Sequence, residues 1–198
     1  MCLFVESIQL NNGEFKRLEL HQERIRRAMS DYYPTQNPFE LESVLSNISY
    51  PPEGLYKCRI VYDTRIHSLE FIPYVKREIH TLRLVDTLMK STPYKKENRR
   101  LLNDAFNLRG DCDDVILMKK GYLTDTSFAN IALFDGYDWI TPRVPLIYGV
   151  NRTQLVGQGK LIEKDILASE LVNFLRVSLF NAMNDFGSIE LDISAIRQ

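Results

Sequence analysis

Hydrophobic and polar residues in the first part of the chain alternate in short segments that predict strands, with two segments of helical spacing between them. Residues 3–10 and 15–20 predict two strands of a hairpin, joined by the turn residues Asn11-Asn12-Gly13. Residues 21–29 predict the start of a basic helix, and apolar residues recur at helical spacing in residues 39–48. Three more strands are expected, at residues 56–62, 68–75 and 81–85. This part therefore predicts an antiparallel sheet with two helices.

After Pro93 the pattern changes to short strands separated by Gly and Asp turns, with helices before and after them. A helix is expected over residues 96–108, ended by Gly110. The later expected elements are strands at 115–119, 121–125, 129–134, 139–141 and 189–193, and helices at 153–160 and 169–175. The polar stretch Asp86–Thr92 is the predicted linker. We therefore expect a two-lobed α/β (α+β) protein with a small domain over residues 1–90 and a larger one over 91–198.

Composition narrows the class of protein. The chain has 198 residues, 44% hydrophobic and 26% charged, which is typical of a globular protein. A net charge of −1 gives no attraction for nucleic acid or an anionic membrane. No apolar run could span a bilayer, and the N-terminus lacks a signal-type segment, so a cytoplasmic protein is expected. The three cysteines and three histidines show no metal-binding spacing, so no metal is expected.

A lysine pair, Lys95-Lys96, stands at the start of the expected helix, and Lys95 is a candidate for chemistry. Lys95 opens the segment Lys95-Lys96-Glu97-Asn98-Arg99, just after Pro93 and Tyr94. A lysine amine that attacks an aldehyde must be partly buried, so that it can be neutral near pH 7. Taken alone, the segment is better explained as a solvated lysine pair at the start of a helix, because short motifs match by chance.

Three other segments contain groups that bind anions or pair with cations. Residues 123–131, Leu-Thr-Asp-Thr-Ser-Phe-Ala-Asn-Ile, contain Asp125 and Asn130. Residues 149–152, Gly-Val-Asn-Arg, precede an expected helix, whose first N–H groups favour an anion. Residues 21–25, His-Gln-Glu-Arg-Ile, place Arg24 among several basic residues. Separately, each segment could be structural: Asp125 could cap a turn, and Arg24 could lie on an exposed basic face.

In this order, these segments resemble the fold-type IV pyridoxal-phosphate enzymes, a family that contains branched-chain and D-amino-acid aminotransferases and 4-amino-4-deoxychorismate lyase. The resemblance implies that pyridoxal 5′-phosphate is the cofactor and that Lys95 is both its covalent partner and the catalytic acid–base group. It implies that Asp125, supported by Asn130, pairs with the pyridinium nitrogen, where the family usually has Glu. It assigns the phosphate to Arg24 and to the backbone N–H groups of Val150 and Asn151. A third phosphate contact of the family falls at Ala182-Met183, which have no hydroxyl.

The resemblance extends to the N-terminal hairpin, where Val5-Glu6-Ser7-Ile8 matches a family segment and Ser7 takes the place of a hydroxyl that could assist proton transfer. It also implies a homodimer and a small-molecule amine substrate. Relative to the family, the chain is expected to be shortened at both ends.

The pattern is closest to the lyases, through Lys-x-x-Asn-Arg at 95–99 and Asn181-Ala182-Met183. The resemblance therefore implies conversion of 4-amino-4-deoxychorismate to p-aminobenzoate and pyruvate, in the folate pathway. Two alternatives stay open: an aminotransferase for a branched-chain or D-amino acid, and a relative that has kept the fold without catalysis.

Overall fold

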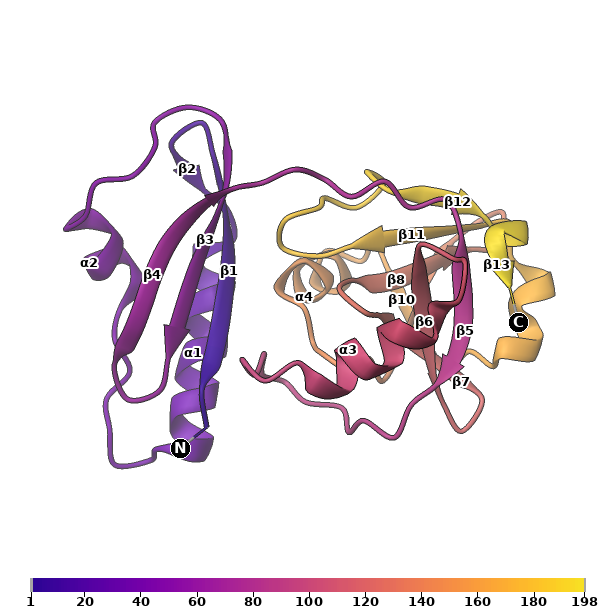
Figure 1. Cartoon of the computed structure of the whole chain (residues 1–198), viewed down its shortest axis with the longest axis horizontal. Helices are drawn as coiled ribbons and strands as arrows, with labels where there is room; N and C mark the ends of the chain where they lie inside the picture. The colour runs from indigo at the N-terminus through magenta and orange to yellow at the C-terminus, as the bar shows by residue number, and fades with distance from the viewer. Residues whose placement is uncertain (1, 198) are drawn as a thin grey trace. The chain divides into compact units, whose positions relative to one another are not determined.

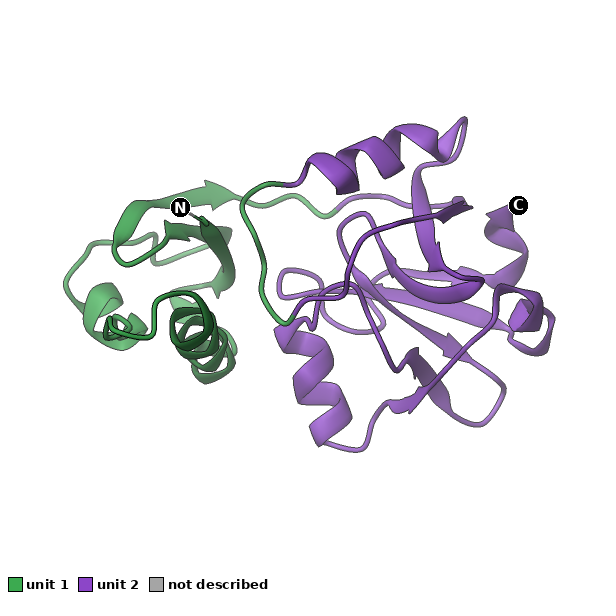
Figure 2. Ribbon diagram, turned by 90° about the horizontal axis from the view of Figure 1, so that it is seen from below, with its two compact units in different colours: residues 1–76, 93–98 green, residues 77–92, 99–198 purple. Residues whose placement is uncertain are grey.

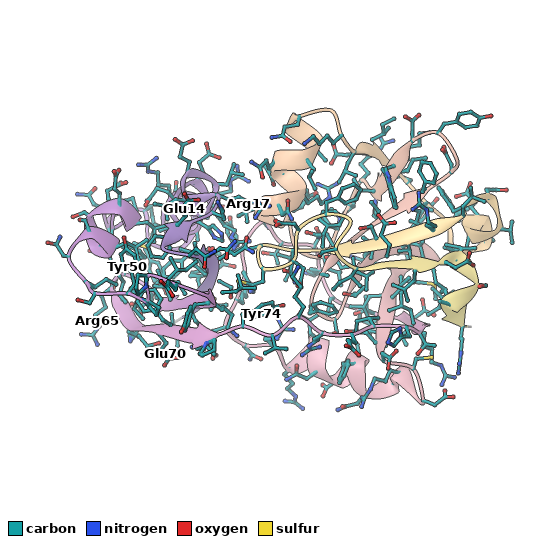
Figure 3. All side chains as sticks on the ribbon, turned by 90° about the horizontal axis from the view of Figure 1, so that it is seen from above. Glu14, Arg17, Tyr50, Arg65, Glu70 and Tyr74 are labelled. Atoms are coloured by element: carbon teal, nitrogen blue, oxygen red, sulfur yellow. The ribbon has the colours of Figure 1, made fainter. Side chains whose placement is uncertain are left out.

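The computed structural model describes residues 2–197 as strands, short helices and connecting turns (Figure 1). The chain divides into two compact units (Figure 2). Unit 1 contains Met1–Lys76 and Pro93–Asn98, and unit 2 contains Arg77–Thr92 and Arg99–Gln198. The chain therefore passes from unit 1 to unit 2, returns for six residues that include Lys95, and enters unit 2 again.

Unit 1 is a four-stranded antiparallel sheet with helix α1 along one face (Figure 1). The strand order is β2-β1-β3-β4. The elements are β1 (Phe4–Asn11), β2 (Glu14–Phe15), α1 (Leu18–Tyr32), α2 (Leu41–Ser46), β3 (Leu55–Tyr62) and β4 (Ile66–Pro73). The predicted hairpin is present, but its second strand has only two residues because α1 begins earlier than expected, at Leu18.

Strand β1 is buried on both faces, so its alternating side chains contact two different sets of residues. Phe4 and Ile8 pack into the core of unit 1 with Ile25 and Met29 of α1. Ser7, between them in sequence, points to the opposite face, because successive residues of a strand alternate. Both faces of β1 thus have side chains that require specific partners.

The segment containing Lys95 is extended rather than helical and pairs with β1. The N–H of Val5 donates to the carbonyl of Lys95 at 2.8 Å, and the N–H of Glu97 donates to the carbonyl of Leu3 at 2.9 Å. Helix α3 begins only at Arg100, so the expected helical start at Lys96 is wrong. The backbone of this segment is therefore fixed by two strand-type hydrogen bonds and not by helical hydrogen bonds.

Unit 2 contains a nine-stranded mixed sheet, among the described residues. Its main path runs β10-β9-β8-β7-β6-β5-β13, and β11 joins β8 and β12. The strands are β5 (Leu82–Asp86), β6 (Asp114–Lys119), β7 (Tyr122–Thr126), β8 (Asn130–Phe134), β9 (Trp139–Pro142), β10 (Ile162–Lys164), β11 (Arg176–Phe180), β12 (Glu190–Asp192) and β13 (Ile196–Arg197). The helices are α3 (Arg100–Phe106), α4 (Val150–Gly157) and the 3₁₀ segments Asn107–Arg109, Ala168–Asn173 and Ile193–Ala195.

The core of unit 2 lies on the faces of this sheet. Ile116, Ile131, Leu133 and Leu179 belong to its largest apolar cluster, and all four side chains are fully buried. A smaller cluster packs α3 against β6, through Leu102 and its neighbours. Burial on both sides explains why the strands are apolar with little alternation.

Three expectations need correction. The strand expected at 81–85 does not extend the N-terminal sheet: β5 pairs in parallel with β6 and β13 of unit 2. The helix expected at 169–175 is a 3₁₀ segment that ends at Asn173. Strands β10, β11 and β13 were not expected. Of these, β10 and β13 have only three and two residues and carry too little periodicity to detect.

Among residues 2–197, every helix is too short or too polar to cross a lipid bilayer.

Candidate active site

Lys95 is partly buried in unit 1 and its side chain meets a hydroxyl group. Lys95 Nζ donates to Ser7 Oγ at 2.9 Å, and Ser7 is itself buried on β1. Lys96 is exposed, and its Nζ lies 5.3 Å from the centre of the Tyr32 ring. The two lysines therefore have different surroundings, and it is Lys95 that lies beside Ser7.

On the other face of β1, a buried ionic cluster joins the strand to α1. Glu6 accepts from Arg24 twice, from Nε at 2.9 Å and from Nη2 at 2.6 Å. It also accepts from His21 Nδ1 at 2.5 Å. This fork geometry, with both carboxylate oxygens engaged, is the strong form of an arginine–carboxylate pair.

The charges in this cluster compensate one another. Burial alone would raise the pKa of Glu6, but Arg24 and His21 outweigh it and lower the pKa to about 2. Burial lowers the pKa of His21, in spite of the neighbouring Glu6 carboxylate. His21 Nε2 has no hydrogen-bond partner among the described residues. Arg24 is therefore held rigidly by Glu6, within unit 1.

In unit 2, Asp125 and Asn130 face each other across the end of the β7–β8 hairpin. Asn130 Nδ2 donates to Asp125 Oδ1 at 2.8 Å and to the carbonyl of Ile147 at 2.8 Å. The N–H of Ile147 donates to Asp125 Oδ2 at 2.8 Å. Both carboxylate oxygens are thus fixed in place by hydrogen bonds from the protein.

Asp125 is buried and forms no ion pair with any residue that the structure describes. Burial raises its pKa to about 6, although the hydrogen bonds from Ile147 and Asn130 act in the opposite direction. A buried carboxylate of this kind is suited to a cationic partner that comes from outside the chain.

Asn130 also connects Asp125 to the start of α4. A Cβ atom on Gly149 would lie 2.1 Å from Asn130 Oδ1, so only glycine fits at this position. Gly149 is the N-cap of α4 and provides no capping side chain. The first N–H groups of the helix, those of Val150 and Asn151 among them, have no acceptor within the helix.

The side chain of Asn151 is directed away from this role. Its Nδ2 donates to the carbonyls of Asn181 at 2.9 Å and Asn184 at 3.3 Å. Asn181 in turn donates from Nδ2 to the carbonyl of Phe128 at 3.1 Å. Asn151 therefore ties the start of α4 to the turn at Asn181–Asn184, and its side chain is structural while its N–H faces the helix start.

The predicted site residues thus fall into two groups, one in each unit. Lys95 and Arg24 belong to unit 1, on opposite faces of β1, and Asp125, Asn130, Val150 and Asn151 form a connected group in unit 2. The partnership of Arg24 with Glu6 was missed. A charged residue between two core-facing positions of a strand, as in Phe4-Val5-Glu6-Ser7-Ile8, was the available signal. No group of metal-binding side chains occurs within residues 2–197.

Comparison with known proteins places this arrangement in a family. No protein-family profile matches the sequence. An uncharacterised protein of Haemophilus influenzae is 32% identical over 184 residues, covering 90% of this chain and 96% of that protein. The crystal structure of a candidate 4-amino-4-deoxychorismate lyase from Haemophilus somnus 129PT is 29% identical, with a TM-score of 0.86 over 93% of this chain and 98% of its own. The chain belongs to the fold-type IV family of pyridoxal-phosphate-dependent enzymes.

The fold-type IV architecture is shared more widely. A candidate amino-acid aminotransferase from Mesorhizobium loti has the same fold at 20% identity, with a TM-score of 0.83 over 97% of this chain and 99% of its own. The predicted family and fold class are confirmed, and with them the expectation of a pyridoxal-phosphate-dependent enzyme. The lengths of both matched structures are close to that of this chain.

The residues of unit 2 fit this cofactor. Among the described residues, none forms a direct ion pair with the buried Asp125 carboxylate, although the charge of Arg152 lowers its pKa, and a protonated pyridine nitrogen would be a direct partner. The first turn of α4 presents N–H groups that suit a phosphate. The donor set therefore agrees with both charged ends of pyridoxal phosphate.

Replacing Gly149 with alanine should damage the site through Asn130. The added methyl group would overlap Asn130 Oδ1, and Asn130 cannot turn away without breaking its bonds to Asp125 and Ile147. We expect Gly149→Ala to lower the free energy of unfolding by roughly 1–3 kcal/mol and to weaken binding of pyridoxal phosphate, measured by denaturant titration and absorbance.

Gly157 provides the matched control, because it lies in the same helix and a Cβ there would meet no atom within 4 Å. Gly157→Ala should leave binding unchanged and stabilise the protein by up to about 1 kcal/mol. Equal behaviour of the two variants would show that Asn130 does not pack against Gly149.

The raised pKa of Asp125 predicts a pH-dependent cost to folding in the absence of cofactor. The carboxyl is protonated below its unfolded pKa of about 4, where burial costs little. Between that pH and the folded pKa of about 6, the unfolded state releases its proton first, so stability falls as the pH rises. The free energy of unfolding should be lower by about 3 kcal/mol above pH 6 than below pH 4.

Asp125→Asn cannot titrate, so the difference in unfolding free energy between wild type and variant isolates this group. Denaturant titrations at pH 4, 5, 6 and 7 should show wild type losing stability relative to the variant across this range. A constant difference would mean that the pKa of Asp125 is not raised in the folded protein.

Proposed function

We propose that this protein is a lyase that converts 4-amino-4-deoxychorismate to p-aminobenzoate and pyruvate. The observation that carries the proposal is the 2.9 Å hydrogen bond between Lys95 Nζ and Ser7 Oγ, which puts a proton-transferring hydroxyl beside the reactive amine. The 29% identity to a candidate lyase of this kind supports it. The structural relatives as a group support a broader assignment, to a pyridoxal-phosphate-dependent lyase or aminotransferase.

The proposed reaction removes the proton from the carbon that bears the amine and breaks the ether bond at the neighbouring carbon. When bound, pyridoxal phosphate draws electrons from the first of these carbons and so makes its proton acidic. Lys95, as a neutral amine, accepts that proton. The departing enolpyruvate gains a proton and becomes pyruvate, and the ring that remains is aromatic.

Ser7 has two tasks in this proposal. Its hydroxyl holds Lys95 Nζ at the correct distance for proton transfer, and it can carry a proton between the amine and the departing group. Because Ser7 is buried on a central strand of its sheet, the hydroxyl has little freedom to move. Such preorganisation lowers the cost of reaching the reactive geometry.

The other residues are assigned to cofactor binding. Asp125, oriented by Asn130 and the N–H of Ile147, holds the pyridinium proton. The N–H groups of Val150 and Asn151 hold the phosphate, with Arg24 as a further ligand. Glu6 then acts as the positioning residue for Arg24, since it fixes the Nε and Nη2 edge of the guanidinium. The family resemblance also supports the proposal of a homodimer.

A product assay tests the lyase against the two alternatives. The purified protein with pyridoxal phosphate should release p-aminobenzoate and pyruvate in equal amounts from 4-amino-4-deoxychorismate. Ser7→Ala should lower kcat about 10- to 100-fold, and Ser7→Thr, which keeps the hydroxyl, should restore most of it.

The alternatives give different results in this assay. An aminotransferase would convert the cofactor to its pyridoxamine form when given a branched-chain or D-amino acid alone, with release of a keto acid. A non-catalytic relative would do neither. Either result would overturn the lyase proposal.

Lys95 should be the residue that binds the cofactor covalently. Reduction of the holoprotein with borohydride, followed by peptide mass spectrometry, should find the label on Lys95. Lys95→Ala should abolish the labelling. Lys96→Ala should retain it, because the segment is extended and adjacent side chains point to opposite faces. Label on Lys96 in the wild-type protein would contradict the assignment.

A further inference from the structure

Two arginines of unit 2 converge on the Ser127–Phe128 loop, which connects β7 to β8. Arg99 Nη2 donates to the carbonyl of Ser127 at 2.7 Å. The guanidinium carbon of Arg77 lies 5.1 Å from the centre of the Phe128 ring. Neither arginine has a part in cofactor binding as assigned above, so their convergence calls for another explanation.

The positive charge of this pair exceeds the negative charge beside it. The nearby carboxylate is that of Asp114, which is fully buried and lies 3.8 Å from Arg77 Nη1. Its Oδ1 already accepts from the N–H of Val115 at 2.7 Å and that of Ser127 at 3.3 Å, and its Oδ2 accepts from Ser127 Oγ at 2.9 Å. One carboxylate, mostly engaged with the loop, thus faces two guanidinium groups.

The excess of positive charge affects the pKa of Arg99. It is half-buried, and burial lowers its pKa, as does the neighbouring charge of Arg77, while Asp114 compensates only partly. No ion pair to Arg99 is formed by any residue within 2–197. Its direct polar contact is a neutral carbonyl, which leaves the other donors of the guanidinium for an anion.

The loop to which both arginines bind belongs to the candidate site. Ser127 follows Asp125 by two residues, and the loop ends at Asn130, the partner of Asp125. On its other side, Phe128 accepts from Asn181, which links the loop to the turn beside α4. An anion held by Arg77 and Arg99 would therefore lie close to the residues proposed to hold the cofactor in unit 2.

We propose that Arg77 and Arg99 bind the ring carboxylate of the substrate, on the side of the ring opposite the amine. This inference rests on the proposed function, because 4-amino-4-deoxychorismate and its product p-aminobenzoate both have a carboxylate in that position. A branched-chain amino acid has a single carboxylate, next to the amine, and offers nothing to such a pair. The two arginines then select for an amine with a distant carboxylate.

Binding of p-aminobenzoate to the holoprotein tests the inference without requiring turnover. Calorimetry should give a dissociation constant that rises about 10- to 100-fold in Arg99→Gln, through loss of a charged hydrogen-bonding partner. Arg77→Gln, at a more exposed side chain, should raise it about 3- to 10-fold. Aniline, which lacks the carboxylate, should bind wild type and both variants equally.

Arg100→Gln is the matched control, since it removes the same charge one residue away from Arg99, at a largely exposed side chain. Arg100→Gln should leave the dissociation constants of p-aminobenzoate and of aniline unchanged. The cofactor absorbance of all variants should match that of wild type, which separates loss of substrate binding from damage to the cofactor site. With 4-amino-4-deoxychorismate, Arg99→Gln should raise KM and leave kcat nearly unchanged.

The outcomes separate this inference from the proposed function. Lyase activity in wild type with unchanged p-aminobenzoate binding in Arg99→Gln and Arg77→Gln would overturn the arginine site and leave the function standing. Absence of lyase activity, together with arginine-dependent binding of p-aminobenzoate over aniline, would overturn the function and retain a carboxylate site. Equal weakening by Arg100→Gln would show a general charge effect and overturn the arginine site.

Discussion

The buried carboxylate of Asp125 is the constraint around which unit 2 is arranged. A carboxylate without a direct ion pair among the described residues is costly to bury, and here the hydrogen bonds from Asn130 and the N–H of Ile147, together with the charge of Arg152, limit that cost. The same Asn130 restricts position 149 to glycine, and that glycine begins α4. One side chain thus sets both the position of the acid and the position of the helix end.

Unit 1 is arranged around β1 in a comparable way. Successive residues of the strand serve opposite faces, so Glu6 holds Arg24 and His21 while Ser7 holds Lys95. The strand needs polar residues on both faces and apolar residues around them. That requirement explains why its sequence, Phe-Val-Glu-Ser-Ile, follows no simple alternation of apolar and polar residues.

Much of the fold could be predicted because most strands are long enough to show their pattern. Residues 56–62 and 115–119 agree with β3 and β6 within one residue at each end. Pairing was harder to predict: β5 joins β6 across a connection that contains α3, and nothing within residues 82–86 specifies that partner. The helix expected at Lys96 was wrong because strand pairing with Val5 and Leu3 overrides local preference.

The site was predicted by resemblance to a greater extent than by residue chemistry. Lys95, Asp125 and Asn130 stand in recognisable segments, whereas the Glu6–Arg24 pair and the convergence of Arg77 and Arg99 join residues distant in sequence. Such pairings depend on the tertiary structure and leave no local periodicity. Asn151 illustrates a further limit: its position was correctly placed at a helix start, yet its side chain serves the Asn181–Asn184 turn.

The strand-like backbone at Lys95 has a consequence for how this site could change in evolution or by design. A nucleophile on a helix could shift by three or four residues and stay on the same face, but on a strand only every second position shares a face. Moving the amine to position 96 would turn it away from Ser7, while position 97 would return it to the same face, about 7 Å further along the strand. The amine can therefore move along this strand only in steps of two residues if it is to stay on the same face, and a shift by a single residue would move it to the opposite face.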